Sequence, residues 1–201
     1  MFAIALSMFS FALVGAITPG PVNIIATSSG ASFGALRTLP LVTGSTLGYV
    51  LVVLVSGIGI NTLGDILPQL TTVLQYLGGA FLLYLAYKIA TSVPEIGSQQ
   101  TSLSTPPTLV EGALAQLLNP KAWLVAMSGV ALFVSTQISS GSYLALFSAI
   151  SFIACFIGVA TWAMSGQLIS HWLNTPTRLR FFNRTLGVML ALTVTTLFME
   201  P

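Results

Sequence analysis

Long runs without a charged side chain dominate this sequence. Residues 1–36, 38–64, 66–87 and 122–170 contain no Asp, Glu, Lys or Arg. A helix of about twenty apolar residues crosses the hydrocarbon core of a bilayer, because each residue adds roughly 1.5 Å. These runs are long enough for about five crossings. Charged residues make up only 5% of the chain, which excludes an ordinary soluble or disordered protein, so we predict an all-α integral membrane protein.

Six transmembrane helices account for the pattern of apolar segments and turn signals. They are predicted over about 2–31, 40–61, 71–91, 109–134, 143–168 and 181–199. The first helix is interrupted at residues 18–21 and the fourth at residues 119–120, in both cases by proline.

A polar, proline-rich segment divides the chain into two halves. Residues 93–108 cannot form a packed core and are expected to be a mobile linker. They separate a first repeat, about 1–92, from a second repeat, about 109–201, within a single transmembrane domain that spans 1–201. Each half has three helices, so the second half must run inverted relative to the first.

The basic residues predict the orientation of the chain. Lys and Arg follow the first, third and fifth predicted helices, at positions Arg37, Lys88, Arg178, Arg180 and Arg184. The loops after the second and fourth helices contain only Asp65 or no charge at all. The positive-inside rule therefore places the basic loops in the cytoplasm and both termini outside it, in a multi-pass protein of the inner (plasma) membrane.

Both helix breaks fall near the predicted bilayer centre. A proline lacks the N–H group that would bond the carbonyl four residues earlier, and lipid cannot satisfy that oxygen. The carbonyls freed in this way are those of Gly15, Ile17 and Gln116. Protein, water or a ligand must satisfy them.

Each break also predicts the start of a new half-helix. Thr18 precedes Pro19, and Asn119 precedes Pro120, so each proline follows a residue suited to an N-cap. A helix that restarts at the midplane directs N–H groups and the positive end of its dipole inward, where an anion is stabilised. Broken helices at matching positions of two halves indicate a transporter's binding site. The alternative is that the prolines are ordinary kinks without a function.

Lys121 is an unusual residue at the second break. It lies in the first turn of a half-helix, where the dipole and the membrane both disfavour a cation. A negative group of a substrate would explain that position. The alternatives are that Lys121 snorkels to the cytoplasmic surface or pairs with Glu111.

Several segments of the chain match motifs of a known family. They are TPGPVN at 18–23, LQYLGGAFLLYLAYK at 74–88, EGALAQLLNPKAW at 111–123, RLRFFNRTLGVML at 178–190 and the glycines between Gly30 and Gly59. Through these segments the sequence resembles the LysE/RhtB family of amino-acid exporters. It implies a six-helix inner-membrane carrier that exports amino acids or their relatives and is driven by the proton gradient. The family's motif positions fall on Pro19, Gly20, Pro21, Asn23, Asn119, Pro120 and Lys121. Many relatives carry an acidic residue after a glycine in the second helix, whereas Gly48 is followed here by Tyr49, which argues against a cationic substrate.

These features lead us to expect a secondary active, alternating-access antiporter that exports a small neutral amino acid or derivative in exchange for protons. The expected substrate-binding residues are Thr18, Pro19, Gly20, Pro21, Asn23, Gln116, Asn119, Pro120 and Lys121. Candidates for lining the path are Thr43, Ser45, Thr46 and Tyr49. Glu111 is the candidate for carrying the coupled proton.

Other classes of protein lack their sequence signals. We expect no metal site, cofactor, nucleic-acid partner or enzymatic activity, since ligand clusters and nucleotide or hydrolase motifs are missing. The spacings Gly30-x-x-x-Gly34 and Gly44-x-x-x-Gly48 either pack helices within the chain or form the face of a homodimer. The rival functions are a small-ion or metal exporter on a related six-helix scaffold and a membrane scaffold that transports nothing.

Overall fold

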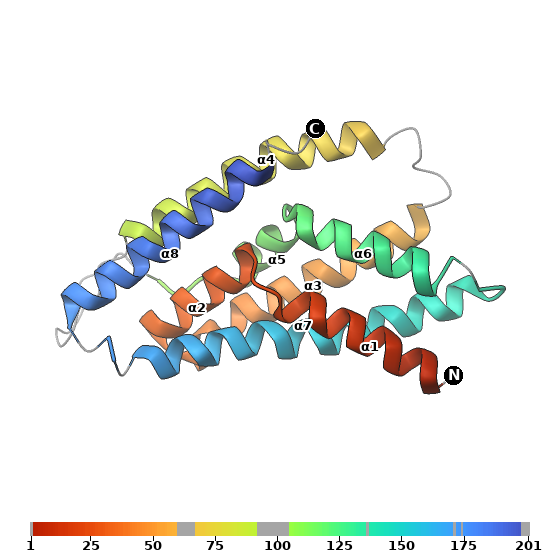
Figure 1. Cartoon of the computed structure of the whole chain (residues 1–201), viewed down its shortest axis with the longest axis horizontal. Coiled ribbons are helices and arrows are strands. Elements are labelled where there is room, and N and C mark those ends of the chain that lie inside the picture. Colours follow the sequence, from red (N-terminus) through yellow and green to blue (C-terminus); the bar gives the residue numbers. More distant parts are fainter. Residues whose placement is uncertain are drawn as a thin grey trace.

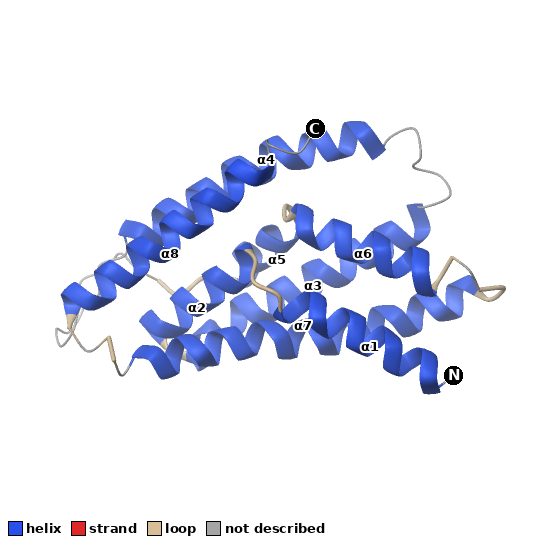
Figure 2. Cartoon of the chain, viewed as in Figure 1, coloured by secondary structure: helices blue, strands red, loops and turns tan. Residues whose placement is uncertain are grey.

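The computed structural model describes residues 2–59, 67–91, 105–135, 137–170, 172–173 and 175–197. These residues form helices and loops without a strand (Figure 2). The helices are α1 (Phe2–Ile17), α2 (Pro21–Phe33), α3 (Ala35–Gly59), α4 (Leu67–Thr91), α5 (Leu109–Leu117), α6 (Pro120–Phe133), α7 (Ser140–Ser170) and α8 (Pro176–Leu197). The all-α prediction is confirmed, and so are both breaks, which separate α1 from α2 and α5 from α6.

Two of these helices are long and apolar enough to cross a membrane alone. They are α3, with 25 residues, and α7, with 31. The pair α1 and α2, bent by 64° at its break, makes a third candidate span. The six-span inverted repeat expected from the sequence therefore stays a prediction, and Asp65 and residues 93–104 of the linker lie outside the described residues.

The helices form an elongated bundle in which the two halves of the chain interleave. Helix α2 packs on α7, α3 packs on α5 and α7, and α4 packs on α8. In Figure 1 the α4–α8 pair lies along the upper side of the bundle. Helices α2, α4 and α7 end toward the left of this view, and α3 and α8 begin there, while α1 begins and α3 ends on the right.

Glycines bring these helices into backbone contact in reciprocal pairs. A Cβ added to Gly30 of α2 would overlap the carbonyl of Ala163 in α7, and one added to Gly166 of α7 would overlap the carbonyl of Thr27 in α2. The same exchange joins α3 to α5. There a Cβ on Gly44 would overlap the carbonyl of Leu109, and a Cβ on Gly112 would overlap the carbonyl of Leu41. Gly30, Gly44 and Gly48 thus pack helices within the chain, whereas Gly34 makes no such close contact and ends α2 with a φ of 85°.

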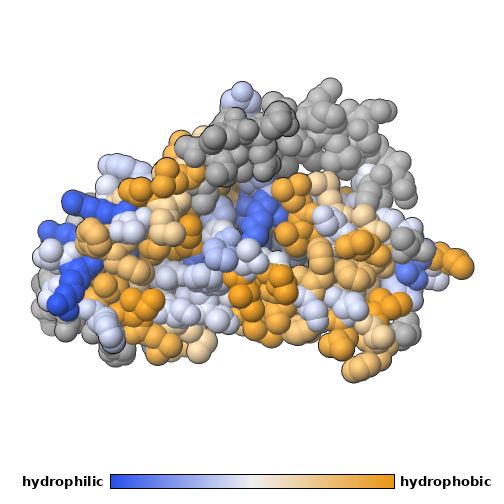
Figure 3. Space-filling view, in the orientation of Figure 1, coloured by the Kyte–Doolittle hydropathy of each residue, from blue (hydrophilic) through white to orange (hydrophobic). Residues whose placement is uncertain are grey.

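The outer surface of the bundle is largely apolar. Large hydrophobic side chains such as Val14, Leu36 and Ile58 are exposed to the surroundings. Figure 3 shows apolar residues over much of the visible face, with strongly hydrophilic residues at the left end and a further hydrophilic group near the middle. Such a surface suits contact with lipid chains rather than water.

Candidate functional site

The first break is built by two prolines and a glycine. Helix α1 ends with the Thr18 hydroxyl donating to the carbonyl of Val14 at 2.6 Å. Gly20, in an extended conformation, is the N-cap of α2, and Pro21 follows at its first position. The prediction that Thr18 is the N-cap was therefore wrong. A residue before proline is driven out of the helical region, so α2 cannot begin until Pro21, and the Thr18 hydroxyl bonds back to the last turn of α1 instead.

Side chains of the protein satisfy carbonyls at the end of α1. The amide nitrogen of Asn23 donates to the carbonyls of Ala16 and Thr18, both at 2.9 Å. The indole nitrogen of Trp162 in α7 donates to the carbonyl of Ile17 at 3.0 Å. Asn23 thus braces the break from inside α2. For the freed carbonyl of Ile17, the partner is therefore the protein itself.

The second break follows the predicted form. The Asn119 side chain accepts a hydrogen bond from the backbone N–H of Lys121 at 3.1 Å and caps α6, with Pro120 at the first helical position. The carbonyl of Gln116 accepts from the backbone N–H of Asn119 at 3.2 Å. Trp123 donates to the carbonyl of Leu117 at 2.7 Å. The end of α5 is therefore also closed by the protein's own groups.

Lys121 joins the two breaks. Its ammonium donates to the carbonyl of Thr18 at 2.5 Å and to the carbonyl of Pro19 at 3.3 Å. These carbonyls follow the C-terminus of α1, where the helix dipole favours a cation. Lys121 does not pair with Glu111, because Glu111 pairs with Lys88 at 2.5 Å instead.

A small cavity lies where the breaks meet. It is lined by Gly15, Ala16, Gly20, Val22, Asn23, Tyr49, Gln116, Asn119, Lys121, Ala122, Val125, Cys155 and Val159. Its volume of about 30 Å³ has room for roughly two water molecules. Lys121 is the charged residue in this lining. As lined by the described residues, the cavity therefore combines one cation, three carboxamides, a phenol and a thiol with an otherwise apolar wall.

The structure brings together some of the predicted site residues and separates others. Gly20, Asn23, Gln116, Asn119, Lys121 and Tyr49 line the cavity. Thr18 and Pro19 meet Lys121 through their carbonyls, while Pro21 and Pro120 begin the half-helices. Thr43, Ser45 and Thr46 are not in the lining, and the hydroxyls of Ser45 and Thr46 donate to the carbonyl of Val42.

Glu111 lies outside the cavity lining, at the start of α5. Its carboxylate accepts from the backbone N–H of Thr108 at 2.7 Å, and the Thr108 hydroxyl accepts from the Glu111 N–H at 3.2 Å, which together form a capping box. The same carboxylate pairs with Lys88 at the end of α4. These contacts tie two helix ends together and describe a structural role for Glu111.

Sequence reasoning missed the contribution of α7. Cys155 and Val159 line the cavity from this helix. Apolar residues occur on every side of α7, so the sequence gives no periodic signal that would single out the face that meets the cavity. Across the described residues, no group of three or more His, Cys, Asp or Glu residues is placed to hold a metal ion.

Two broken helices that meet at a polar cavity within an apolar bundle define a class of protein, the membrane transporters. The chain belongs to the LysE type translocator family, whose model matches residues 13–200. It is therefore a transporter rather than an enzyme, and the family resemblance predicted from the sequence is confirmed.

Individual relatives agree with the family assignment. The chain is 30% identical over 188 residues to a cysteine/O-acetylserine efflux protein of Escherichia coli O1:K1, with 92% of this chain and 91% of the relative covered. It is 31% identical over 195 residues to a protein of the same description from Shigella flexneri serotype 5b, with 96% and 94% covered. No solved structure matches the chain significantly.

Proposed function

We propose that this protein exports a small neutral amino acid, or a close derivative, across the inner membrane by alternating access. Cysteine and O-acetylserine are the first candidates, because the relatives that match most of the chain are described as efflux proteins for these compounds. Both compounds are zwitterions at neutral pH. A suitable site must therefore accept a carboxylate and an ammonium group at once.

One observation carries the proposal: the ammonium of Lys121 lies beside the N-terminus of α2, within the cavity lining. A Cβ on Gly20 would be 3.3 Å from the Lys121 nitrogen. Gly20 provides no side chain to cap α2, so the first-turn N–H groups of this helix are suited to an anion. Lys121 and the start of α2 together would bind the substrate's carboxylate through charge-assisted hydrogen bonds.

The substrate's ammonium has acceptors in the same place. When Lys121 turns toward a carboxylate, the carbonyls of Thr18 and Pro19 that it now bonds become available to the incoming ammonium. The carboxamide oxygen of Gln116 is a further acceptor in the cavity lining. Among the residues that the structure describes, no carboxylate lines the cavity. A lysine-like or arginine-like side chain would find no counter-charge there, which favours a neutral substrate.

Transport requires a change of shape, because a cavity of about 30 Å³ is too small for an amino acid. We propose that two inverted three-helix repeats, in a six-span arrangement with both termini outside, supply that change. Proton entry would drive it. The meeting of one break from each half at a single cavity supports this arrangement.

A competition experiment tests the assignment of the carboxylate site. Proteoliposomes loaded with labelled cysteine under reducing conditions should release it in a protein-dependent manner, and unlabelled O-acetylserine should compete. Cysteamine, which is cysteine without its carboxylate, should compete at least about tenfold more weakly, since an unmade hydrogen bond to a charged group costs about 1.5–3 kcal/mol. Equal competition by cysteamine would refute the carboxylate site, and absence of any amino-acid flux would favour a scaffold role.

A further inference from the structure

Four buried hydroxyl groups have no hydrogen-bond partner among the described residues. They belong to Tyr49, Ser56, Ser148 and Ser151, whose side chains are 4%, 6%, 7% and 0% exposed. Native proteins pair nearly all of their buried polar groups, so each unpaired group requires an explanation. These four occur on just two neighbouring helices, α3 and α7.

The contacts between α3 and α7 place these hydroxyls in one seam. A Cβ on Gly57 of α3 would overlap the side chain of Leu144 in α7. Nearer the cavity, Tyr49 of α3 and Cys155 of α7 line the same pocket. The helices therefore run antiparallel, with high numbers in α3 opposite low numbers in α7. Spacings of three, four and seven residues put side chains on the same face of a helix.

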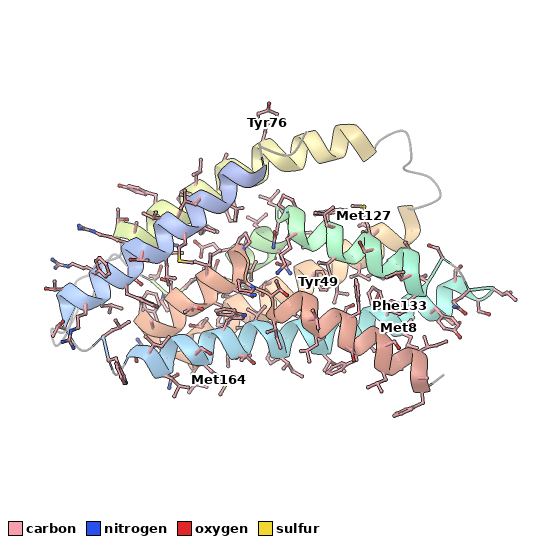
Figure 4. The ribbon with its side chains drawn as sticks, viewed as in Figure 1. Met8, Tyr49, Tyr76, Met127, Phe133 and Met164 are labelled. Carbon is pink, nitrogen blue, oxygen red and sulfur yellow. The ribbon has the colours of Figure 1, made fainter. Side chains whose placement is uncertain are left out.

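Because of that spacing, the four hydroxyls lie in a row along the facing sides of α3 and α7. Ser151 and Ser148 are four and seven residues before Cys155, so they continue its face toward the start of α7. Ser56 is seven residues after Tyr49 and continues its face toward the end of α3. Tyr49 and Cys155 line the cavity, and Figure 4 shows Tyr49 near the middle of the bundle. The line leads from the cavity to the end where α3 terminates and α7 begins.

At the opposite end of the bundle, the buried polar side chains form hydrogen bonds with each other. Ser28 donates to Asn183, and Asn183 donates to Ser32, which joins α2 to α8. Ser29 and Thr38 bond each other at 2.8 Å and join α2 to α3. At that end the buried groups named here are paired and hold the helices together, whereas the α3–α7 seam carries unpaired ones.

We propose that the seam between α3 and α7 is the route by which the substrate leaves the cavity for the outside. The ligand is a small zwitterionic amino acid with its hydration water, which needs hydrogen-bond partners throughout a low-dielectric passage. Tyr49, Ser151, Ser148 and Ser56 supply them in sequence once the helices part. This inference rests on the proposed export function and on its orientation, with the end of α3 outside.

Cysteine accessibility tests the route directly. Ser148→Cys and Ser151→Cys are made in a Cys155→Ser background, whose own rate of O-acetylserine export sets the baseline because Cys155 lines the cavity. Cells are treated with a membrane-impermeant, positively charged methanethiosulfonate added outside, and excess reagent is washed away. Both variants should react, and the modification should block export of labelled O-acetylserine, which has no thiol that could reverse it. The matched controls, Ala149→Cys and Ile153→Cys, lie at similar depth on exposed positions of α7 and should not react.

The experiments can refute the proposed exit route and the proposed carboxylate site independently of each other. Lack of reaction at both positions, or reaction only from the cytoplasmic side in inverted vesicles, overturns the route, whatever the result of the cysteamine competition. Ser151→Ala provides a second test. If Ser151 only packs, losing an unpaired hydroxyl stabilises the protein and leaves export unchanged, whereas on the route the same variant is stable and exports several-fold more slowly.

Discussion

The ammonium of Lys121 donates to the backbone carbonyl of Thr18 across 103 positions of sequence, and it thereby joins the start of α6 to the end of α1. A cation that is costly in a membrane is stabilised here by a helix C-terminus. The contact also places a positive charge beside Gly20, the cap of α2. One side chain thus touches both broken helices, and several tests address what it does.

Removal of the Lys121 charge should abolish most transport without unfolding the protein. Lys121→Gln eliminates a charged group from the interior, so we expect normal insertion and a fall in cysteine efflux of at least about tenfold, or about 1.4 kcal/mol. Efflux from proteoliposomes measures this effect. The control is Lys88→Gln, which removes a lysine outside the cavity, and near-normal efflux by Lys121→Gln would contradict the proposal.

A methyl group at Gly20 should disturb the same site sterically. Gly20 has an extended backbone that any residue adopts, but its Cβ would lie 3.2 Å from Cδ and 3.3 Å from Nζ of Lys121. We expect Gly20→Ala to insert normally and to raise the half-saturating substrate concentration several-fold. Gly141→Ala, where an added Cβ meets nothing within 4 Å, serves as the matched control. Identical kinetics in the two variants would argue against a substrate next to Gly20.

Healing the second break should stop export. Asn119→Leu combined with Pro120→Ala removes the cap and the proline, so α5 and α6 would tend to join into one continuous helix. We expect the double variant to reach the membrane in normal amounts and to export no labelled cysteine. Full activity of the healed helix would mean that the break has no role in binding.

We expect Glu111 to stabilise the fold and not to carry the coupled proton. Glu111→Gln weakens the capping box and the pair with Lys88, whose side chain is 36% exposed, so we expect a loss of about 1 kcal/mol in stability. The pH dependence of export should be unchanged. A variant that still exports but no longer responds to pH would instead assign the coupled proton to Glu111.

The orientation predicted from the basic residues is testable by labelling. In a Cys155→Ser background, a cysteine at Ser140 should react with an impermeant thiol reagent in intact cells, while one at Ser102 should be protected. The reverse pattern would overturn both the positive-inside assignment and the direction of the proposed route.

Local chemistry made part of this structure predictable. Proline removes an N–H group wherever it occurs, so both breaks could be located from sequence, and Asn119 caps α6 as its position before Pro120 indicates. Thr18 did not follow the same rule: α2 begins only at Pro21 with Gly20 as its cap, and the Thr18 hydroxyl donates backward to the carbonyl of Val14. A capping side chain that can also bond backward is ambiguous until the backbone direction is known.

Contacts between residues far apart in the sequence could not be predicted, for a different reason. The partner of Lys121 is a backbone carbonyl, and every residue has one, so no residue type marks it. Cys155 and Val159 line the cavity from α7, yet a helix that is apolar on every side does not reveal which face meets a cavity. The unpaired hydroxyls of α3 and α7 likewise become informative only when their neighbours are known.

The reciprocal glycine contacts have a consequence for biogenesis. Gly30 and Gly44 come from the first half of the chain, yet the backbones that cover them belong to α7 and α5 in the second half. These faces of α2 and α3 can be covered within the chain only after α5 and α7 have been synthesised. We therefore expect a chain truncated before α7 to be degraded faster in cells than the full chain.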